Sequence, residues 1–111
     1  LSLGHGVFQG RAAGTTQFQS LYRRWKRETR FLSFTGEIVM NAAYQHIMAM
    51  GPTIVPDILR QLSLEGDSPS YWFWALEHLT NDDPVPSDER GNARAMRNRW
   101  LNWAREHGIA V

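Results

Sequence analysis

The chain has 111 residues and a net charge of +1, which fits one domain and gives no sign of a highly charged partner. It contains no Cys, which excludes disulfides, thiolate zinc sites and Cys nucleophiles and suits a reducing cytoplasm. No run approaches the ~18 apolar residues that a membrane-spanning helix needs, so we expect no membrane partner.

Residues 1–16 are rich in Gly, Ala, Ser and Thr and show no sustained apolar period. Such a segment does not bury enough apolar surface to offset the entropy that is lost on ordering. We expect a flexible N-terminal arm here. A vector-derived origin for part of it stays open, because the chain starts without Met. Residues 17–111 are expected to form a single all-helical domain.

The first helix is expected to begin at Thr16, with Thr15 or Thr16 as its N-cap. Basic residues occupy most of its surface. A break follows at residues 33–36, and a short turn of helix is expected over residues 37–40. The apolar residues of the first helix recur at three- and four-residue spacing and predict one buried stripe of Phe18, Leu21, Tyr22, Trp25 and Leu32.

Residues 41–64 are interpreted as two short helices joined by a bend, around which the rest of the fold is built. Asn41 is a good N-cap for a helix over residues 42–50. Gly51 supplies the left-handed residue that ends this helix, and Pro52 suits the first position of the next one. The second helix has an inward stripe formed by Ile54, Ile58 and Leu62.

Residues 71–79, YWFWALEHL, are apolar almost all round, which is typical of a helix buried on most sides. The run would also suit a strand, but no second strand-like run exists to pair with it. A loop follows, and Ser87 or Asn92 is expected to cap a last helix that ends at Gly108. The fold class expected is therefore all-α with about five helices, arranged as antiparallel pairs or as a compact bundle.

Several segments resemble known proteins. Residues 50–62, MGPTIVPDILRQL, resemble the bend and second helix of a HEAT-like repeat. The run WFWALEHLTNDDPVP, followed by AMRNRWLNWARE, is similar to the closing units of such arrays. Together with WKRETRFLS and AYQHIMAMG, these segments resemble a family of small uncharacterised bacterial proteins. The resemblance implies a helical binding scaffold and brings no catalytic residues.

Arginines form one candidate site, a nucleic-acid interface. If the arginines of the first and last helices were coplanar, their guanidinium groups could straddle a nucleic-acid backbone. The alternative, that they are solvated helix faces, is favoured by the low net charge and by the lack of a helix-turn-helix signature. The rows at helical spacing are Arg23, Arg27 and Arg30 in the first helix, and Arg90, Arg94, Arg97 and Arg105 in the last.

Aromatic residues form a second candidate site, for a protein partner. Consecutive residues on a helix point about 100° apart, so the four aromatics at the start of residues 71–79 cannot all face one core. Exposed Trp and Tyr are frequent binding anchors. The alternative is that they form core, and the candidate partner-binding residues are Tyr71, Trp72 and Trp74.

Histidines and carboxylates offer weaker candidates. The acids of residues 77–89 do not match an EF-hand loop and are better explained as a solvated loop and a helix N-terminus. His46, His78 and Glu77 are the only plausible acid–base or metal group, and an isolated helical His is most often structural. No GxSxG, P-loop or HExxH motif is present. We therefore expect no catalytic residues, no metal and no cofactor.

The sequence favours a non-enzymatic protein–protein interaction module in a bacterial cytoplasm, which binds another protein through an aromatic or apolar groove. The alternative is an accessory nucleic-acid-binding protein that uses the arginine rows. A homodimer stays open, because a second copy can fill an apolar groove on a protein this small.

Overall fold

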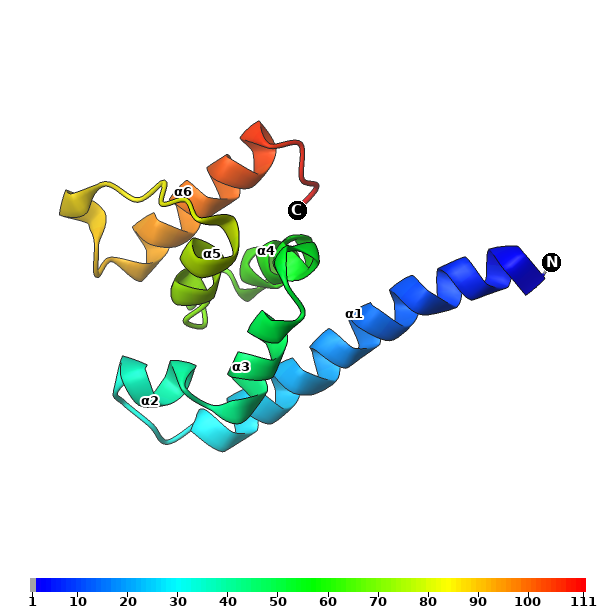
Figure 1. Ribbon diagram of the computed structural model, residues 1–111. Coiled ribbons are helices and arrows are strands. Elements are labelled where there is room, and N and C mark those ends of the chain that lie inside the picture. Colours follow the sequence, from blue (N-terminus) through cyan, green and yellow to red (C-terminus); the bar gives the residue numbers. More distant parts are fainter. Residues whose placement is uncertain (1) are drawn as a thin grey trace. The chain divides into compact units, whose positions relative to one another are not determined.

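A computed structural model describes the helical course of the chain over residues 2–111 and the side chains of residues 15–111 (Figure 1). The described residues contain six α-helices, two short 3₁₀ helices and no strand. The all-α class and the count of about five helices that the sequence predicts are therefore confirmed. No helix among these residues has both the length and the apolar character needed to cross a bilayer.

The chain divides into two units, residues 1–49 and 50–111. The helices α3 (Ala42–Ala49) and α4 (Val55–Glu65) belong to different units, so their packing as a HEAT-like hairpin stays a prediction, as does the single domain at 17–111. Unit 1 contains α1 (Ser2–Thr29), α2 (Thr35–Val39) and α3 (Ala42–Ala49). Unit 2 contains η1 (Pro52–Ile54), α4 (Val55–Glu65), α5 (Phe73–Thr80), η2 (Ser87–Glu89) and α6 (Ala93–Glu106).

Helix α1 begins at Ser2 and not at Thr16, where the apolar stripe begins. Apolar periodicity reports a buried face and not the helix itself, and no Pro blocks the helix before Thr16. Only the helical course of residues 2–14 is described, so the flexible arm expected at 1–16 stays a prediction. The stripe is confirmed over most of its length, but Leu32 lies beyond the end of α1 and is exposed.

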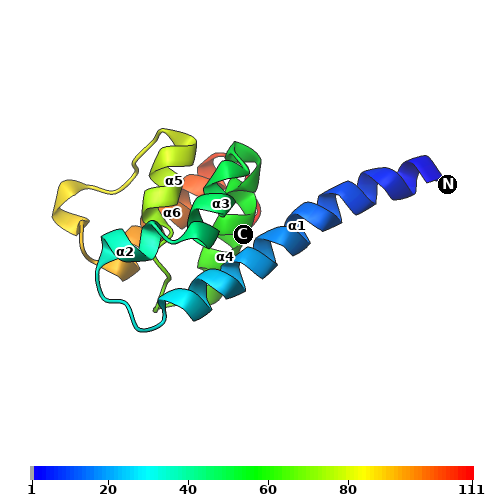
Figure 2. The same ribbon diagram turned by 60° about the horizontal axis from the view of Figure 1, so that its bottom comes forward.

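The core of unit 1 forms where α3 packs along the C-terminal half of α1, which both ribbon views show (Figures 1 and 2). Trp25 of α1 and Tyr44 of α3 are fully buried, with ring centroids 4.9 Å apart. The indole Nε1 of Trp25 donates a hydrogen bond to the backbone oxygen of Ile38 at 2.8 Å, which ties α2 to α1. One buried side chain therefore joins all three helices of the unit.

The core of unit 2 forms where α4 packs against α5 and α6. Residues 73–80 are helical, so the preference for a helix over a strand in the aromatic run is confirmed. A fully buried Phe or Trp removes about 150–250 Å² from water, worth up to about 4–6 kcal/mol before entropy is subtracted. The largest fully buried side chains of the unit are Trp72, Trp100, Phe73, Ile58, Leu59, Leu62 and Leu76.

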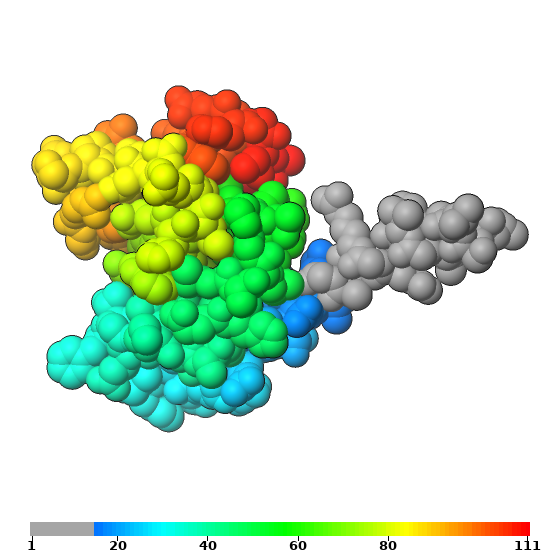
Figure 3. Space-filling model, in the orientation of Figure 1, coloured from blue at the N-terminus to red at the C-terminus, as the bar shows by residue number. Residues whose placement is uncertain are grey.

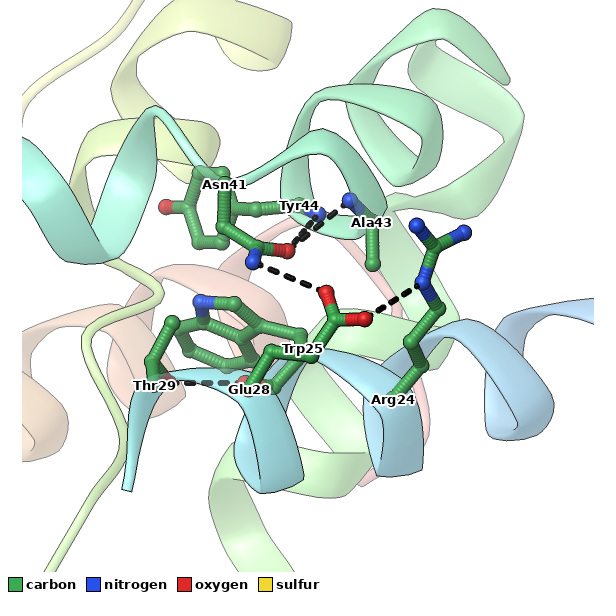
Figure 4. A network of polar contacts seen from close by, with 7 residues as sticks. All are labelled: Arg24, Trp25, Glu28, Thr29, Asn41, Ala43 and Tyr44. Carbon is green, nitrogen blue, oxygen red and sulfur yellow. Dashed lines mark hydrogen bonds and ion pairs between the residues drawn. The ribbon is translucent and has the colours of Figure 1, made fainter. Parts of the chain in front are cut away.

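Asn41 caps the start of α3 and also joins α3 to α1 (Figure 4). Its Oδ1 accepts hydrogen bonds from the backbone N–H groups of Ala43 at 2.8 Å and Tyr44 at 3.4 Å, which confirms the predicted N-cap. Its Nδ2 donates to Glu28 Oε1 at 3.1 Å, and Glu28 Oε2 pairs with Arg24 Nε at 3.0 Å. The hydrogen bond from Asn41, and then the contact with Arg24, lower the pKa of Glu28.

Replacing Asn41 by Ala is expected to lower the free energy of unfolding by about 1 kcal/mol, because α3 loses its cap. Urea denaturation measures this loss. Asn41→Ser is the matched control: the hydroxyl can still cap the helix but no longer reaches Glu28 as an amide donor. Ser should therefore recover most of the stability, and equal losses in the two variants would contradict a capping role.

The same two variants should raise the pKa of Glu28 toward its ordinary value, because both lose the amide donor. A carboxylate whose pKa is lowered by folding contributes stability above its unfolded pKa, and this is lost as the pH falls through the folded pKa. The free energy of unfolding should therefore fall less steeply in both variants as the pH is lowered through the acid range. An NMR titration of Glu28 checks the direction of the pKa change.

Candidate interaction surfaces

The predicted aromatic site of unit 2 is largely core. Trp72 is fully buried, so its assignment as a partner-binding residue is wrong: a partner cannot reach its ring in the folded chain. Tyr71 and Trp74 are half-buried and lie against neighbouring rings. Tyr71 meets Phe73 edge to face at 5.5 Å, and Trp74 lies 4.7 Å from the ring of His78. A binding role for Tyr71 and Trp74 stays a prediction.

Arginines of the last helix form hydrogen bonds and ion pairs within unit 2. Arg97 donates from Nε to the backbone oxygen of Leu62 at 3.1 Å and from a terminal nitrogen to that of Ser63 at 2.8 Å. These carbonyls lie in the last turn of α4, where backbone oxygens lack partners within the helix. Arg97 is therefore a capping residue for α4. Arg94 forms an exposed ion pair with Asp67 at 2.8 Å.

Arg99 and Glu89 form a two-pronged ion pair that holds η2 to α6. The Nε of Arg99 lies 2.9 Å from one carboxylate oxygen of Glu89, and a terminal nitrogen lies 2.6 Å from the other. The hydrogen bonds from Arg99 lower the pKa of Glu89, and those to Glu89 raise the pKa of Arg99. Arg90 similarly pairs with Asp83. The basic residues around α6 thus satisfy acids and carbonyls of their own unit.

The arginine row of the first helix differs, because none of its exposed members forms an ion pair within the described residues. Arg23, Arg27 and Arg30 follow one another at the helical spacing expected from the sequence. The acid of the same helix, Glu28, pairs with Arg24 instead. The guanidinium carbon of Arg30 lies over the ring of Phe31, 4.8 Å from its centroid. The row therefore ends at an exposed aromatic side chain.

Exposed apolar side chains gather where α1 turns into α2 and where α2 ends. Figure 3 shows this segment in cyan at the surface of unit 1. Six large hydrophobic side chains are exposed among the described residues, and four of them fall between residues 31 and 40. These four define the apolar corner: Phe31 (86% exposed), Leu32 (38%), Phe34 (73%) and Met40 (67%).

The apolar corner is exposed because α1 ends at Thr29, so the residues that follow do not continue the buried face of the helix. The hydroxyl of Thr29 donates to the backbone oxygen of Trp25 at 2.7 Å, and the N–H of Leu32 donates to the oxygen of Thr29 at 2.9 Å. Phe34 then precedes α2 in an extended conformation without a side-chain cap. The sequence signal for this surface is the group of three large apolar residues, Phe31, Leu32 and Phe34, at the predicted break in residues 33–36, where a helix no longer covers them.

Unit 2 contains an apolar pocket with a volume of about 280 Å³. Trp103 is fixed in its wall, because its indole Nε1 donates to Asp82 Oδ2 at 2.8 Å and its ring stacks on His107 at 3.9 Å. The residues that line this proline pocket are Pro52, Val55, Pro56, Leu79, Thr80, Trp103 and Ile109.

Charge is divided unequally between the units, which the net charge of +1 conceals. Residues 1–49 contain six Lys or Arg and two Asp or Glu, a net charge of +4. Residues 50–111 contain six Lys or Arg and nine Asp or Glu, a net charge of −3. Unpaired charge follows the same division. Within the part of the chain that the structure describes, the carboxylates of Glu77, Asp82, Asp88 and Glu106 in unit 2 form no ion pair.

The histidines and acids considered as a catalytic or metal group are distributed over both units. His46 lies on α3 of unit 1, with Nε2 at 3.5 Å from Gln17 Nε2, while Glu77 and His78 lie on α5 of unit 2. Across residues 15–111, no three or more His, Asp or Glu side chains are placed to hold a metal ion.

Comparison of the chain with protein-family models, with curated proteins and with solved structures finds no match.

Proposed function

We propose that this chain is a non-enzymatic interaction module that binds another protein through the apolar corner of unit 1. The observation that carries the proposal is the gathering of four exposed, large apolar side chains within ten residues. Water-exposed apolar groups are common singly, whereas contiguous ones mark interaction sites. The resemblance to HEAT-like scaffolds and to a bacterial family supports the same function and a cytoplasmic location.

The surroundings of the corner indicate the chemistry of the partner. Phe31 and Phe34 would act as anchors that enter apolar hollows, since aromatic residues dominate the energetics of interfaces. Arg30 lies over the ring of Phe31, and Arg23, Arg27 and Arg30 form no ion pairs among the described residues. A partner segment with apolar side chains and nearby carboxylates fits both features, and its rim charges would mainly raise the association rate.

A nucleic-acid ligand is the second candidate, and one observation favours it. The arginine row, which forms no ion pair among the described residues, is followed in the chain by two exposed aromatic rings, those of Phe31 and Phe34, and Arg30 lies over the first. Single-stranded nucleic acids bind to such combinations of cationic groups and stacking surfaces. The arginines of α6 add little to this candidate, because Arg97 already binds backbone carbonyls of α4.

The test separates the two candidates by affinity and salt dependence. The partner is captured from an extract of the source organism, identified by mass spectrometry, purified, and titrated calorimetrically against wild type and variants. Phe31→Ser with Phe34→Ser should weaken binding at least about 10-fold, because each ring buries an apolar area worth more than 1.4 kcal/mol. Arg23→Glu with Arg27→Glu should weaken it less, because the charges lie at the rim.

The matched control is Leu64→Ser, since Leu64 is strongly exposed, is the most exposed large apolar side chain outside the corner among the described residues, and lies in unit 2. Its affinity should equal that of wild type. An unchanged affinity of the double Phe variant would refute the corner as the binding surface. Oligonucleotide binding that falls steeply between ~50 and ~200 mM salt, and is abolished by the Arg→Glu changes, would establish the second candidate instead.

A further inference from the structure

We infer that the chain associates head to tail with further copies of itself, the apolar corner of one copy entering the proline pocket of the next. The inference rests on the proposed binding role of the corner and names its partner. It adds a function for the pocket of unit 2, which the proposed function does not use.

The pocket has the size and the walls to accept an aromatic ring. An enclosed cavity of ~150 Å³ lined by apolar side chains is enough to hold benzene, and the proline pocket, which is open to solvent, measures about 280 Å³. Val55, Leu79 and Trp103 supply apolar walls. Among the described side chains of unit 1, Phe31 and Phe34 are the most exposed aromatic ones and supply rings of the required kind. The same chain therefore carries both an exposed apolar surface, the apolar corner, and an apolar pocket that could receive it.

The charges beside the two surfaces are opposite in sign. Arg30 lies over the ring of Phe31, and Arg27 precedes Phe31 by one helical turn. At the pocket, the carboxylate of Asp82 is held against Trp103 at 2.8 Å, and Glu106 follows Trp103 by three residues on α6. None of these arginines and acids forms an ion pair within the described residues. Insertion of the corner would bring arginines toward carboxylates, which favours this orientation over others.

The contact joins two different surfaces, so repeating it gives a closed ring or an open chain and not a two-fold dimer. The corner is small compared with the ≈ 800 Å² per partner of a standard interface, so a weak association is expected, with a dissociation constant on the order of 10–100 µM. Salt should weaken it several-fold between ~50 and ~500 mM, because exposed charges are screened.

Sedimentation velocity of the full chain at about 5–500 µM tests the inference. The mean mass of wild type should rise with concentration at low salt and fall toward the monomer at high salt. Two variants should each stay monomeric. Phe31→Ser with Phe34→Ser removes the corner and leaves the pocket, and Ile109→Arg places a cation at the pocket and leaves the corner. The control, Leu64→Ser, should associate as wild type does.

Mixing the two monomeric variants gives the decisive result. The corner variant contributes an intact pocket and the pocket variant an intact corner, so together they should form a 1:1 complex that grows no further. Restored association also shows that both variants are folded. A two-fold dimer through corner-to-corner contact would instead persist in Ile109→Arg alone, and that outcome would overturn the inference.

Failure here can be told apart from failure of the proposed function. A wild-type chain that stays monomeric up to ~500 µM overturns self-association. The same chain can still lose affinity for a captured protein when Phe31 and Phe34 are replaced, in which case the proposed function holds. If neither readout depends on the two phenylalanines, both are overturned.

Discussion

Replacing Trp100 by Ala is expected to lower the free energy of unfolding by about 3–5 kcal/mol. The side chain is fully buried in unit 2, with its ring centroid 5.4 Å from that of Trp103. Truncation loses the transfer free energy of the indole and leaves a cavity that the surrounding helices fill only in part. Because a domain has only about 5–15 kcal/mol of net stability, the loss should be evident in urea denaturation followed by circular dichroism.

Two Trp→Phe replacements provide the sharper comparison. Trp25 Nε1 donates to the backbone oxygen of Ile38, whereas Trp100 Nε1 is buried without a hydrogen-bond partner in the described part of the chain. Trp25→Phe leaves a carbonyl without its donor, at a cost of about 1–3 kcal/mol beyond the lost packing. Trp100→Phe removes a buried, unsatisfied donor, which offsets part of the lost packing. Equal destabilisation by the two changes would contradict this explanation.

Replacing Gly51 by Ala is expected to lower the free energy of unfolding by about 1–3 kcal/mol. Gly51 has φ 81° and ψ −172°, a backbone region that only Gly adopts at low cost. No atom lies within 4 Å of an added Cβ, so the penalty arises from the backbone and not from a clash. Urea denaturation measures the loss.

Gly36→Ala is the matched control for Gly51→Ala. Gly36 lies in α2, and an added Cβ there also meets nothing within 4 Å. Because Ala favours a helix over Gly by roughly 0.5–1 kcal/mol, this change should be neutral or stabilising. The opposite signs separate the conformational requirement at Gly51 from a general effect of adding a methyl group. Similar losses at both positions would refute the backbone explanation.

Local features of the fold were predictable because they depend on neighbouring residues. The N-cap at Asn41 follows from a side-chain oxygen that satisfies nearby N–H groups. For the last helix the sequence left Ser87 or Asn92 as the cap, and the structure has Asn92, whose Oδ1 accepts from the N–H of Ala95 at 3.1 Å. The positive φ of Gly51 follows from the absence of a side chain. The helix at residues 73–80 was predictable because no other segment could pair with it as a strand. Each is a short-range requirement that one sequence displays.

The candidate surfaces were less predictable, because exposure is settled by packing. Trp72 and Trp74 are two residues apart in one aromatic run, yet the first is fully buried and the second half-exposed. The sequence assigned Leu32 to the buried stripe, whereas the end of α1 at Thr29 leaves it exposed with Phe31 and Phe34.

What the sequence determined by itself is the all-α class, the helix caps and most of the buried stripes, since helical period and capping chemistry operate over a few residues. Only the tertiary structure decided which arginines form hydrogen bonds or ion pairs and which apolar side chains are exposed to solvent. Arg97 reaches carbonyls 34 and 35 residues earlier in the chain, while Arg23, Arg27 and Arg30 form no ion pair among the described residues. Such pairings depend on distances between helices, which no local pattern specifies.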